Sequence, residues 1–491
     1  MTSATLVRGG TVLVGAPRDG RMLRADVLIE DGTITRIGTE IGGVPATARV
    51  VDASDMYVLP GFVDTHHHLW ETVLRGMTAE WNIIDFAWGV RFHHAGAQKP
   101  EDVYAGTYAG AVAALEAGIT TTIDFAHAVN TPDHAREGIR AVTDAGIRAL
   151  WCYGLTDAPS PRPYFASHEA RLADLRALRA ERFAADDARS LVRLGVAVND
   201  IGGVPWDATR AEFLLARELG LTVTAHTDSI WGAVRAPEIE WLHRDGLLGP
   251  GHIHAHVNAA SDAELKLLAD SGAGVSSTPE TELQMGLGLP VFARAAELGI
   301  PSGLGTDIQA NNAADPFAWM RVALHTENAH RHRAALDSPY GTGALGAPHL
   351  SPRDVLHHAT LGGAEVLGLG SVTGSLEPGK AADLVLLRTD GVHQRPVLDP
   401  MATIVLHSRA SDIDTVLVGG AMVKERGRLT GERSAQAVRE VEGAWERLEP
   451  RIEARGGRLP EKPEGLLRQM AQAAVANAPA WASESAEGSV S

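Results

Sequence analysis

The sequence is nearly without cysteine, since Cys152 is the only one in 491 residues. A single cysteine excludes an intrachain disulfide and a cluster of thiolate ligands, so any metal ion must be held by histidine, aspartate or glutamate. Lysine is also scarce and occurs only at positions 99, 266, 380, 424 and 462. This scarcity limits where a lysine could take part in an active site.

The chain also has no long hydrophobic run and no basic stripe. No segment approaches the roughly 18 apolar residues of a membrane-spanning helix, and the first residues lack the charged start and apolar run of a signal peptide. Acidic residues exceed basic ones, 61 against 44, for a net charge of −17, which argues against nucleic acid and anionic membranes as partners. We expect a soluble, cytoplasmic protein that acts on a small-molecule substrate. We further expect a homo-oligomer, a dimer or larger.

Short β patterns lie at both ends of the chain. The strand-like segments are Thr5–Val14, Ala25–Glu30 and Thr33–Ile37 at one end and Ala382–Leu387 and Thr415–Val418 at the other. Asp31-Gly32, between two of these segments, is a strong hairpin signal. The two ends therefore predict one discontinuous small β-sandwich domain, made of residues 1–57 and 371–433.

Between these ends, residues 58–370 alternate apolar strands with amphipathic helices. The candidate strands are Val58–Val63, Thr120–Phe125, Arg148–Tyr153, Arg193–Val198, Leu221–Ala225, Ile253–Ala255, Gly274–Ser277 and Pro301–Leu304. Eight strand-then-helix units predict an α/β fold, a (β/α)8 TIM barrel, whose active site lies at the carboxyl ends of the strands. A doubly wound sheet is the alternative, but no Gly-x-Gly-x-x-Gly turn follows the first strand. Residues 434–491 predict a helical C-terminal tail.

Histidine and aspartate follow several of the predicted strands. His66 and His68 follow the first strand, and the alternation of side chains along an extended chain puts both on one face while His67 points away. His226 ends the fifth strand, and Asp307 follows the eighth. A barrel would bring these side chains to one rim, where three nitrogens and one oxygen suit zinc or ferrous iron, with room for a bound water.

Four segments carry a resemblance to a known family. They are Leu59–Leu69, Gly118–Asp124, Leu304–Asp307 and Gly374–Val385. On these segments the chain resembles the amidohydrolase superfamily, in the branch that holds cytosine deaminase-like, 8-oxoguanine deaminase-like and triazine hydrolase enzymes. The resemblance covers nearly the whole chain, and the first and last segments together are specific.

The resemblance implies a metal-dependent hydrolase that attacks a carbon–nitrogen bond with an activated water. The ligands of one divalent metal, zinc first and iron second, would be His66, His68, His226 and Asp307. Asp307 would also carry the proton of the water to the leaving group. His256, at the end of the sixth strand, would stabilise charge on the attacked centre, with His254 as the fallback. Other branches bridge two metals with a carbamylated lysine, and here no lysine follows a middle strand.

Two positions depart from the family's pattern. Deaminases of this branch carry His-x-x-Glu on the fifth strand, where the Glu protonates a ring nitrogen, but this chain has His226-Thr227-Asp228-Ser229. Glu71 stands where the branch often has a glutamine that binds a substrate carbonyl. Asp228 and Glu71 are thus the two candidate catalytic acids; in the alternative, Asp228 faces away and Glu71 is a solvated carboxylate. His127, just past the second strand, is a candidate for the pocket wall.

Three functions compete. The first is an aminohydrolase, or deaminase, that acts on a small nitrogen heterocycle. The second is an amidohydrolase that cleaves a linear or cyclic amide, or another leaving group, on the same scaffold, which the missing Glu favours. The third is a catalytically inactive binding protein, against which the complete set of candidate ligands argues. Release of ammonia would separate the first function from the second.

Overall fold

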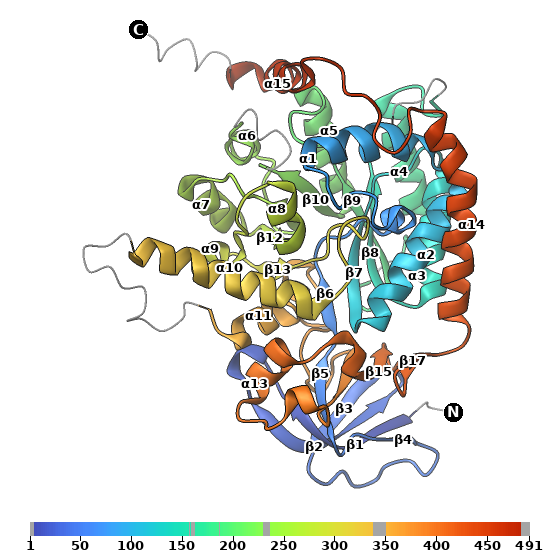
Figure 1. Ribbon diagram of the computed structural model, residues 1–491, viewed down its shortest axis with the longest axis vertical. Helices are drawn as coiled ribbons and strands as arrows, with labels where there is room; N and C mark the ends of the chain where they lie inside the picture. The colour runs from blue at the N-terminus through green and yellow to red at the C-terminus, as the bar shows by residue number, and fades with distance from the viewer. Residues whose placement is uncertain are drawn as a thin grey trace.

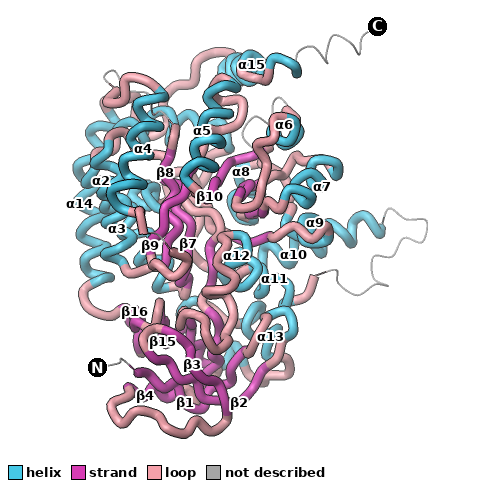
Figure 2. The backbone as a smooth tube through the Cα atoms, turned by 180° about the vertical axis from the view of Figure 1, so that it is seen from behind, coloured by secondary structure: helices cyan, strands magenta, loops and turns pink. Residues whose placement is uncertain are grey.

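Two sheets organise the computed structural model, which describes residues 4–156, 158, 163–185, 187–228, 236–336 and 350–482. One sheet has eight strands and the other has nine. Figure 1 shows the nine-stranded sheet at the bottom of the molecule and the eight-stranded sheet above it, surrounded by helices. The view from behind in Figure 2 shows the same division. The two sheets are therefore separate layers of one chain.

The eight-stranded sheet forms a barrel whose strands follow one another in sequence order and are all parallel. Its strands are β6 (Phe62–Asp64), β7 (Ile119–Ala126), β8 (Arg148–Gly154), β9 (Val192–Ala197), β10 (Thr222–Thr227), β11 (His252–His256), β12 (Gly274–Ser277) and β13 (Ser302–Leu304). The amide of Thr65 donates to the carbonyl of Leu304 at 3.1 Å, which links the first strand to the last. The predicted (β/α)8 barrel is confirmed.

Helices follow most of the barrel strands and pack around them. They are α1 (Ile83–Phe86), α2 (Pro100–Glu116), α3 (Pro132–Ala145), α4 (His168–Arg182), α5 (Trp206–Leu219), α6 (Glu238–Arg244), α7 (Asp262–Ser271), α8 (Pro279–Met285), α9 (Phe292–Glu297), α10 (Pro316–Leu336), α11 (Pro352–His358), α12 (Leu361–Val366), α13 (Pro400–Ala402), α14 (Arg433–Glu453) and α15 (Leu466–Ala476). Helix α14, near the C-terminus, runs along α2 in Figure 1. Among the described residues, every helix is too short or too polar to cross a bilayer.

The nine-stranded sheet combines strands from both ends of the chain. They are β1 (Ala4–Leu13), β2 (Met22–Glu30), β3 (Thr33–Gly38), β4 (Arg49–Asp52), β5 (Met56–Pro60), β14 (Leu384–Arg388), β15 (Ile413–Val418), β16 (Ala421–Glu425) and β17 (Arg428–Leu429). Strand β5 joins the two halves, because it pairs with β1 on one side and with β14 on the other. The division of the chain into domains at residues 57, 370 and 433 stays a prediction.

The first barrel strand differs from the expected one. Val58–Val63 was expected to be a single barrel strand, but β5 belongs to the nine-stranded sheet and only β6 belongs to the barrel. The chain passes from one sheet to the other at Gly61, where a Cβ atom would lie 2.0 Å from Thr120 Oγ1. Only glycine permits this close approach. The barrel strand that leads into the histidines is therefore only β6. The residues just before it, in β5, are held by the nine-stranded sheet.

A buried ion pair joins the two sheets. Arg148, at the start of β8, donates from Nε to Asp383 Oδ2 at 2.8 Å, and both side chains are almost completely buried. Asp383 precedes β14, and its Oδ1 accepts the amide of Gly419 at 2.6 Å. A buried carboxylate that keeps its charge needs such partners, because water cannot solvate it. The pair therefore fixes the bottom of the barrel against the nine-stranded sheet.

We predict that Arg148→Met destabilises the protein by about 3–5 kcal/mol, because the substitution leaves Asp383 buried without its cation. Denaturant unfolding followed by circular dichroism measures this change. Arg176→Met is the matched control: Arg176 pairs with Glu218 at the surface, and such pairs contribute about 0–1 kcal/mol. Equal losses of stability in the two variants would contradict the prediction.

Candidate active site and metal centre

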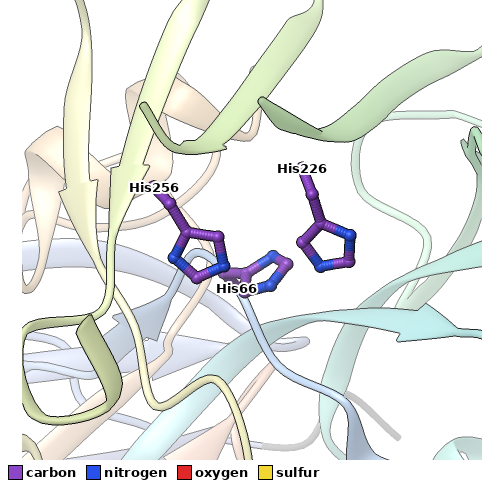
Figure 3. Close-up of side chains that lie close together, drawn as sticks. All are labelled: His66, His226 and His256. Atoms are coloured by element: carbon purple, nitrogen blue, oxygen red, sulfur yellow. The ribbon is translucent and has the colours of Figure 1, made fainter. Parts of the chain in front are cut away.

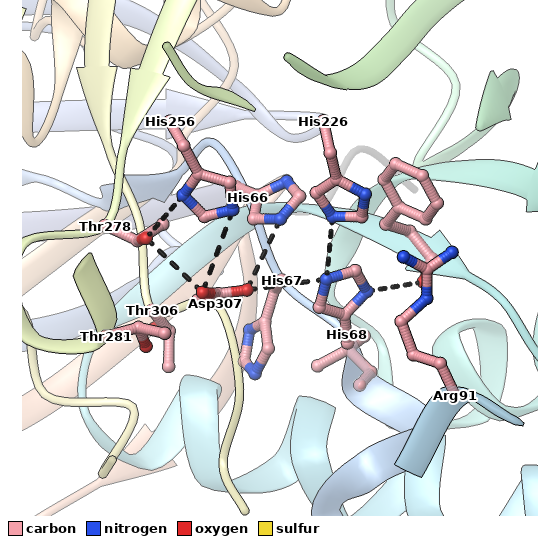
Figure 4. Close-up of polar contacts among 12 residues, drawn as sticks. His66, His67, His68, Arg91, His226, His256, Thr278, Thr281, Thr306 and Asp307 are labelled. Atoms are coloured by element: carbon pink, nitrogen blue, oxygen red, sulfur yellow. Dashed lines mark hydrogen bonds and ion pairs between the residues drawn. The ribbon is translucent and has the colours of Figure 1, made fainter. Parts of the chain in front are cut away.

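Three strand ends, those of β6, β10 and β13, bring three histidines and one aspartate together at the carboxyl end of the barrel. His66 Nε2 and His68 Nε2 each lie 3.4 Å from Asp307 Oδ1. His226, in β10, reaches the same point, with its Nε2 3.3 Å from that of His68. All four side chains are buried. Figure 3 shows His66 and His226 pointing toward each other, and Figure 4 adds Asp307 below them.

His67 lies on the opposite side of the chain. Its Nδ1 is 3.0 Å from Asp64 Oδ2, and its Nε2 is 3.2 Å from the side-chain nitrogen of Gln309. Its ring is drawn below Asp307 in Figure 4, away from His226. The alternation of the three histidines thus puts two of them in the cluster and uses the third to join neighbouring segments.

Hydrogen bonds behind the cluster orient two of the imidazoles. His68 Nδ1 lies 2.9 Å from the carbonyl of Phe125, which can only accept, so this nitrogen carries the proton. His226 Nδ1 lies 3.0 Å from Asp200 Oδ1 and donates to that carboxylate. The Nε2 atoms are then unprotonated in the neutral rings, and their lone pairs face the cluster. Such bonds behind metal-binding histidines fix the tautomer and the ring orientation.

The ionisation of the cluster also fits a cation. Burial lowers the pKa of His66 to about 4 and that of His226 well below its usual value, so both rings are neutral, as metal binding requires. Burial raises the pKa of Asp307, but its close contacts with His66 and His68 and the charge of His256 outweigh burial and hold that pKa well below the usual value. Ligand atoms of His66, His68 and Asp307 all lie within 4.8 Å of one another.

His256 stands beside the cluster at the end of β11, with a φ of 71°. Its Nδ1 is 3.3 Å from Glu282 Oε1 and 3.2 Å from Thr278 Oγ1, and its Nε2 is 4.0 Å from Asp307 Oδ2. Burial lowers the pKa of His256, but the bond to Glu282 and the charge of Asp307 raise it more, so that it is above its usual value. His254, the fallback, instead contacts Thr227 Oγ1 with its Nδ1 at 2.9 Å.

The two candidate acids have different surroundings. Glu71 is completely buried in the 3₁₀ segment Leu69–Leu74, and neither of its oxygens has a hydrogen-bond partner among the described residues. Burial first and the charge of Asp307 second raise its pKa well above the usual value. Asp228 has a φ of 53° and donates its amide to Glu238 Oε2 at 2.9 Å. The pKa of Glu71 is thus held well above the usual value, whereas Asp228 contacts a second carboxyl group through its backbone amide.

His127 forms part of the wall behind the cluster. Its ring stacks on that of His68, with the centroids 4.4 Å apart and the planes 20° from parallel. Burial lowers its pKa well below the usual value, and neither ring nitrogen has a hydrogen-bond partner in the part of the chain that is described. One ring nitrogen each of His68, His127 and His226 lie within 4.8 Å of one another, so His127 is a further candidate ligand beside the predicted set.

A small cavity of about 20 Å³ lies next to the cluster. It is lined by His68, Ile83, Phe86, Arg91, His226, His256, Thr281, Met285, Leu287, Asp307 and Ile308. Ligand sites of enzymes combine such an apolar wall with a few convergent polar groups. The cavity has room for about one water molecule beside the histidines and the aspartate, so a larger ligand requires its lining to move.

Three neighbours of the cluster were not predicted from the sequence. Asp200 follows β9, so its place after a strand end could have revealed it. Glu282 lies in α8, and only its contact with His256 distinguishes it from the other acidic residues of that helix. Arg91 belongs to the π-helical segment Ala87–His94 and reaches Asp200 over a separation of 109 residues. No local pattern marks such a residue.

Known proteins resemble this chain over most of its length. The model of the amidohydrolase family matches residues 57–423. The 5-methylthioadenosine/S-adenosylhomocysteine deaminase of Pyrococcus abyssi is 28% identical over 435 residues, which are 86% of this chain and 93% of the relative. The 5-methylthioadenosine/S-adenosylhomocysteine deaminase 1 of Syntrophus aciditrophicus is 30% identical over 463 residues, which are 89% of this chain and 96% of the relative.

Solved structures share the fold. An adenosine deaminase from Xanthomonas campestris with bound zinc superposes with a TM-score of 0.76 and 22% identity, covering 91% of this chain and 99% of its own. The atrazine chlorohydrolase of Arthrobacter aurescens TC1, complexed with zinc, gives a TM-score of 0.76 and 24% identity, covering 90% of this chain and 100% of its own. At these identities the likeness establishes the fold alone.

Proposed function

The chain belongs to the amidohydrolase family and is a hydrolase of carbon–nitrogen bonds, and from that premise we propose that it is a metal-dependent deaminase of a small amino-substituted heterocycle. The observation that carries the proposal is the convergence of His66, His68, His226 and Asp307 beside a cavity. The names of the relatives favour a purine nucleoside as the first substrate to test. Cleavage of an amide is the second candidate, because the His-x-x-Glu glutamate is missing.

The proposed ligand set suits one divalent ion. His66 supports this assignment, because neither of its buried ring nitrogens has a hydrogen-bond partner among the described residues, although Nε2 faces Asp307. Three imidazole nitrogens and one carboxylate oxygen suit zinc first and iron second. When bound, the ion would lower the pKa of a water molecule toward neutrality and so provide a nucleophile.

The chain's own groups would handle the protons and the charge. Asp307 Oδ2 faces His256 rather than His66 and His68, and we assign it to accept the proton of the attacking water and to pass it to the departing amine. His256, held by Glu282 through Nδ1, would stabilise charge on the attacked carbon with Nε2. The reaction replaces the amino group by the oxygen of water and releases ammonia.

Glu71 is our proposed acid for the ring nitrogen. It is buried, it is close enough to Asp307 for that charge to raise its pKa, and this shift keeps it protonated at higher pH than an ordinary glutamate. A protonated carboxyl group can donate to the substrate ring as water adds. Asp228 is the alternative, in which case it would act together with Glu238.

We predict about one zinc or iron ion per chain in the purified enzyme, together with release of ammonia from an amino-substituted heterocycle. His66→Ala and Asp307→Asn should each abolish turnover, and His66→Ala should also weaken metal binding. Elemental analysis measures the metal, and a coupled ammonia assay on purine nucleosides, free purines, pyrimidines, triazines and acyl amides measures the reaction. Two ions per active chain would contradict the mononuclear site, and amide cleavage without ammonia would favour the second candidate.

A separate prediction concerns the acid. Glu71→Gln keeps the shape of the side chain but cannot donate an acidic proton, so kcat should fall by about two to four orders of magnitude while the metal stays bound. Asp228→Asn is the matched control and should keep kcat within a small factor of the wild type. Steady-state kinetics and elemental analysis on both variants decide between them. The reverse result would assign the role to Asp228 and Glu238, and two active variants would leave Asp307 as the only proton donor.

A further inference from the structure

His226 is oriented by a chain of two further side chains. Its Nδ1 donates to Asp200 Oδ1 at 3.0 Å, and the other carboxylate oxygen of Asp200 accepts from Nη1 of Arg91. Asp200 and Arg91 are only 8% and 5% exposed. If Arg91 were removed, water could therefore not solvate the carboxylate of Asp200 in its place without a change in the surrounding structure.

Arg91 comes from outside the barrel strands. It lies in residues 82–97, which comprise α1, the π-helical segment Ala87–His94 and the 3₁₀ turn Ala95–Ala97, and which we call the covering segment. Ile83 and Phe86 of this segment line the cavity together with Arg91. Figure 4 shows Arg91 entering from the side of the cluster where His68 and His226 lie. The same segment therefore lines the cavity and supplies the partner of Asp200.

The covering segment is fastened from its outer side by residues 455–462, which follow α14 and which we call the C-terminal arm. Lys462 forms an ion pair with Asp85, and Trp88 Nε1 donates to the carbonyl of Pro460 at 3.1 Å. His94 Nε2 lies 3.4 Å from the carbonyl of Gly457. These contacts hold the covering segment both before and after Arg91.

We propose that Arg91 is a positioning residue, which through Asp200 fixes the tautomer and orientation of His226, so that the metal site reaches full affinity only when the covering segment is seated. The inference rests on the proposed function in one respect, namely that His226 is a metal ligand. A carboxylate behind a metal-binding histidine typically accounts for a 10–100-fold difference in metal affinity. Without Arg91, Asp200 is a buried carboxylate that has lost its cation and no longer holds Nδ1 in a fixed place.

The test compares metal affinities in the full-length chain. Zinc is titrated against a chromogenic chelator for wild type, Arg91→Met, Arg91→Lys and His226→Asn. Arg91→Met should bind zinc about 10–100-fold more weakly, whereas Arg91→Lys, which keeps the charge, should recover part of that affinity. Arg148→Met is the matched control, because Arg148 also pairs with a buried aspartate, Asp383, but at the bottom of the barrel, away from the covering segment. It should bind zinc as the wild type does.

The outcomes separate the inference from the function on which it rests. If His226→Asn loses zinc and both Arg91 variants bind it normally, Arg91 is not a positioning residue although the metal centre stands. If His226→Asn binds zinc as tightly as the wild type, the proposed metal centre itself fails. If Arg91→Met does not fold, as judged by circular dichroism, Arg91→Gln, which keeps hydrogen-bonding groups but no charge, replaces it, and wild-type affinity in that variant overturns the inference.

A distant variant tests the part played by the C-terminal arm. Lys462→Met removes the ion pair to Asp85 at a partly exposed position outside the cavity. We expect faster loss of zinc to excess chelator than from the wild type, in the same direction as Arg91→Met but smaller. An unchanged rate of zinc loss would show that the arm does not act on the metal site and would overturn this part of the inference.

Discussion

The burial of one carboxylate among several imidazoles is the constraint on which the rest of the site depends. Asp307 is almost inaccessible to water and its pKa lies well below the usual value, while burial lowers the pKa of His66, which therefore brings a lone pair rather than positive charge. An isolated buried charge costs several kcal/mol or more. A divalent ion would compensate this charge and would use the lone pairs, so the arrangement is explained by a cation better than by hydrogen bonding alone.

The same burial accounts for a deaminase site that lacks the glutamate of the fifth strand. An acid that is to donate a proton near neutral pH must be kept protonated, and a carboxyl group gains this property from desolvation and from a neighbouring negative charge. Glu71 has both, since it is fully buried and is affected by Asp307 and Asp124. Asp228 instead leaves the strand with a positive φ and bonds to Glu238. Glu71, which follows the first barrel strand, can thus supply the catalytic acid in place of a glutamate on the fifth strand.

Sequence patterns predicted the parts of the molecule that local rules determine. Apolar strands separated by amphipathic helices predicted the barrel, and the rule that active sites lie at the carboxyl ends of its strands brought His66, His226 and Asp307 together. The rule failed at Val58–Val63, because an apolar run does not reveal that Gly61 passes the chain from one sheet to another. Arg91 could not be predicted, since its partner is 109 residues away and its helical surroundings carry no signal for the contact.

Substrate entry places one more demand on this architecture. Ile83 and Phe86 line the cavity, whose volume of about 20 Å³ is too small for a substrate, so substrate entry requires the lining to move, as in enzymes whose turnover depends on loops that open and close. The Arg148–Asp383 pair holds the bottom of the barrel and is remote from this movement. The polar contacts of the C-terminal arm are not the only attachment of the covering segment, because Phe86 and Val90 pack in one buried apolar cluster with Leu448 and Ile452 of α14. Arg91 is thus the point at which this packed segment reaches Asp200 and, through it, the candidate ligand His226.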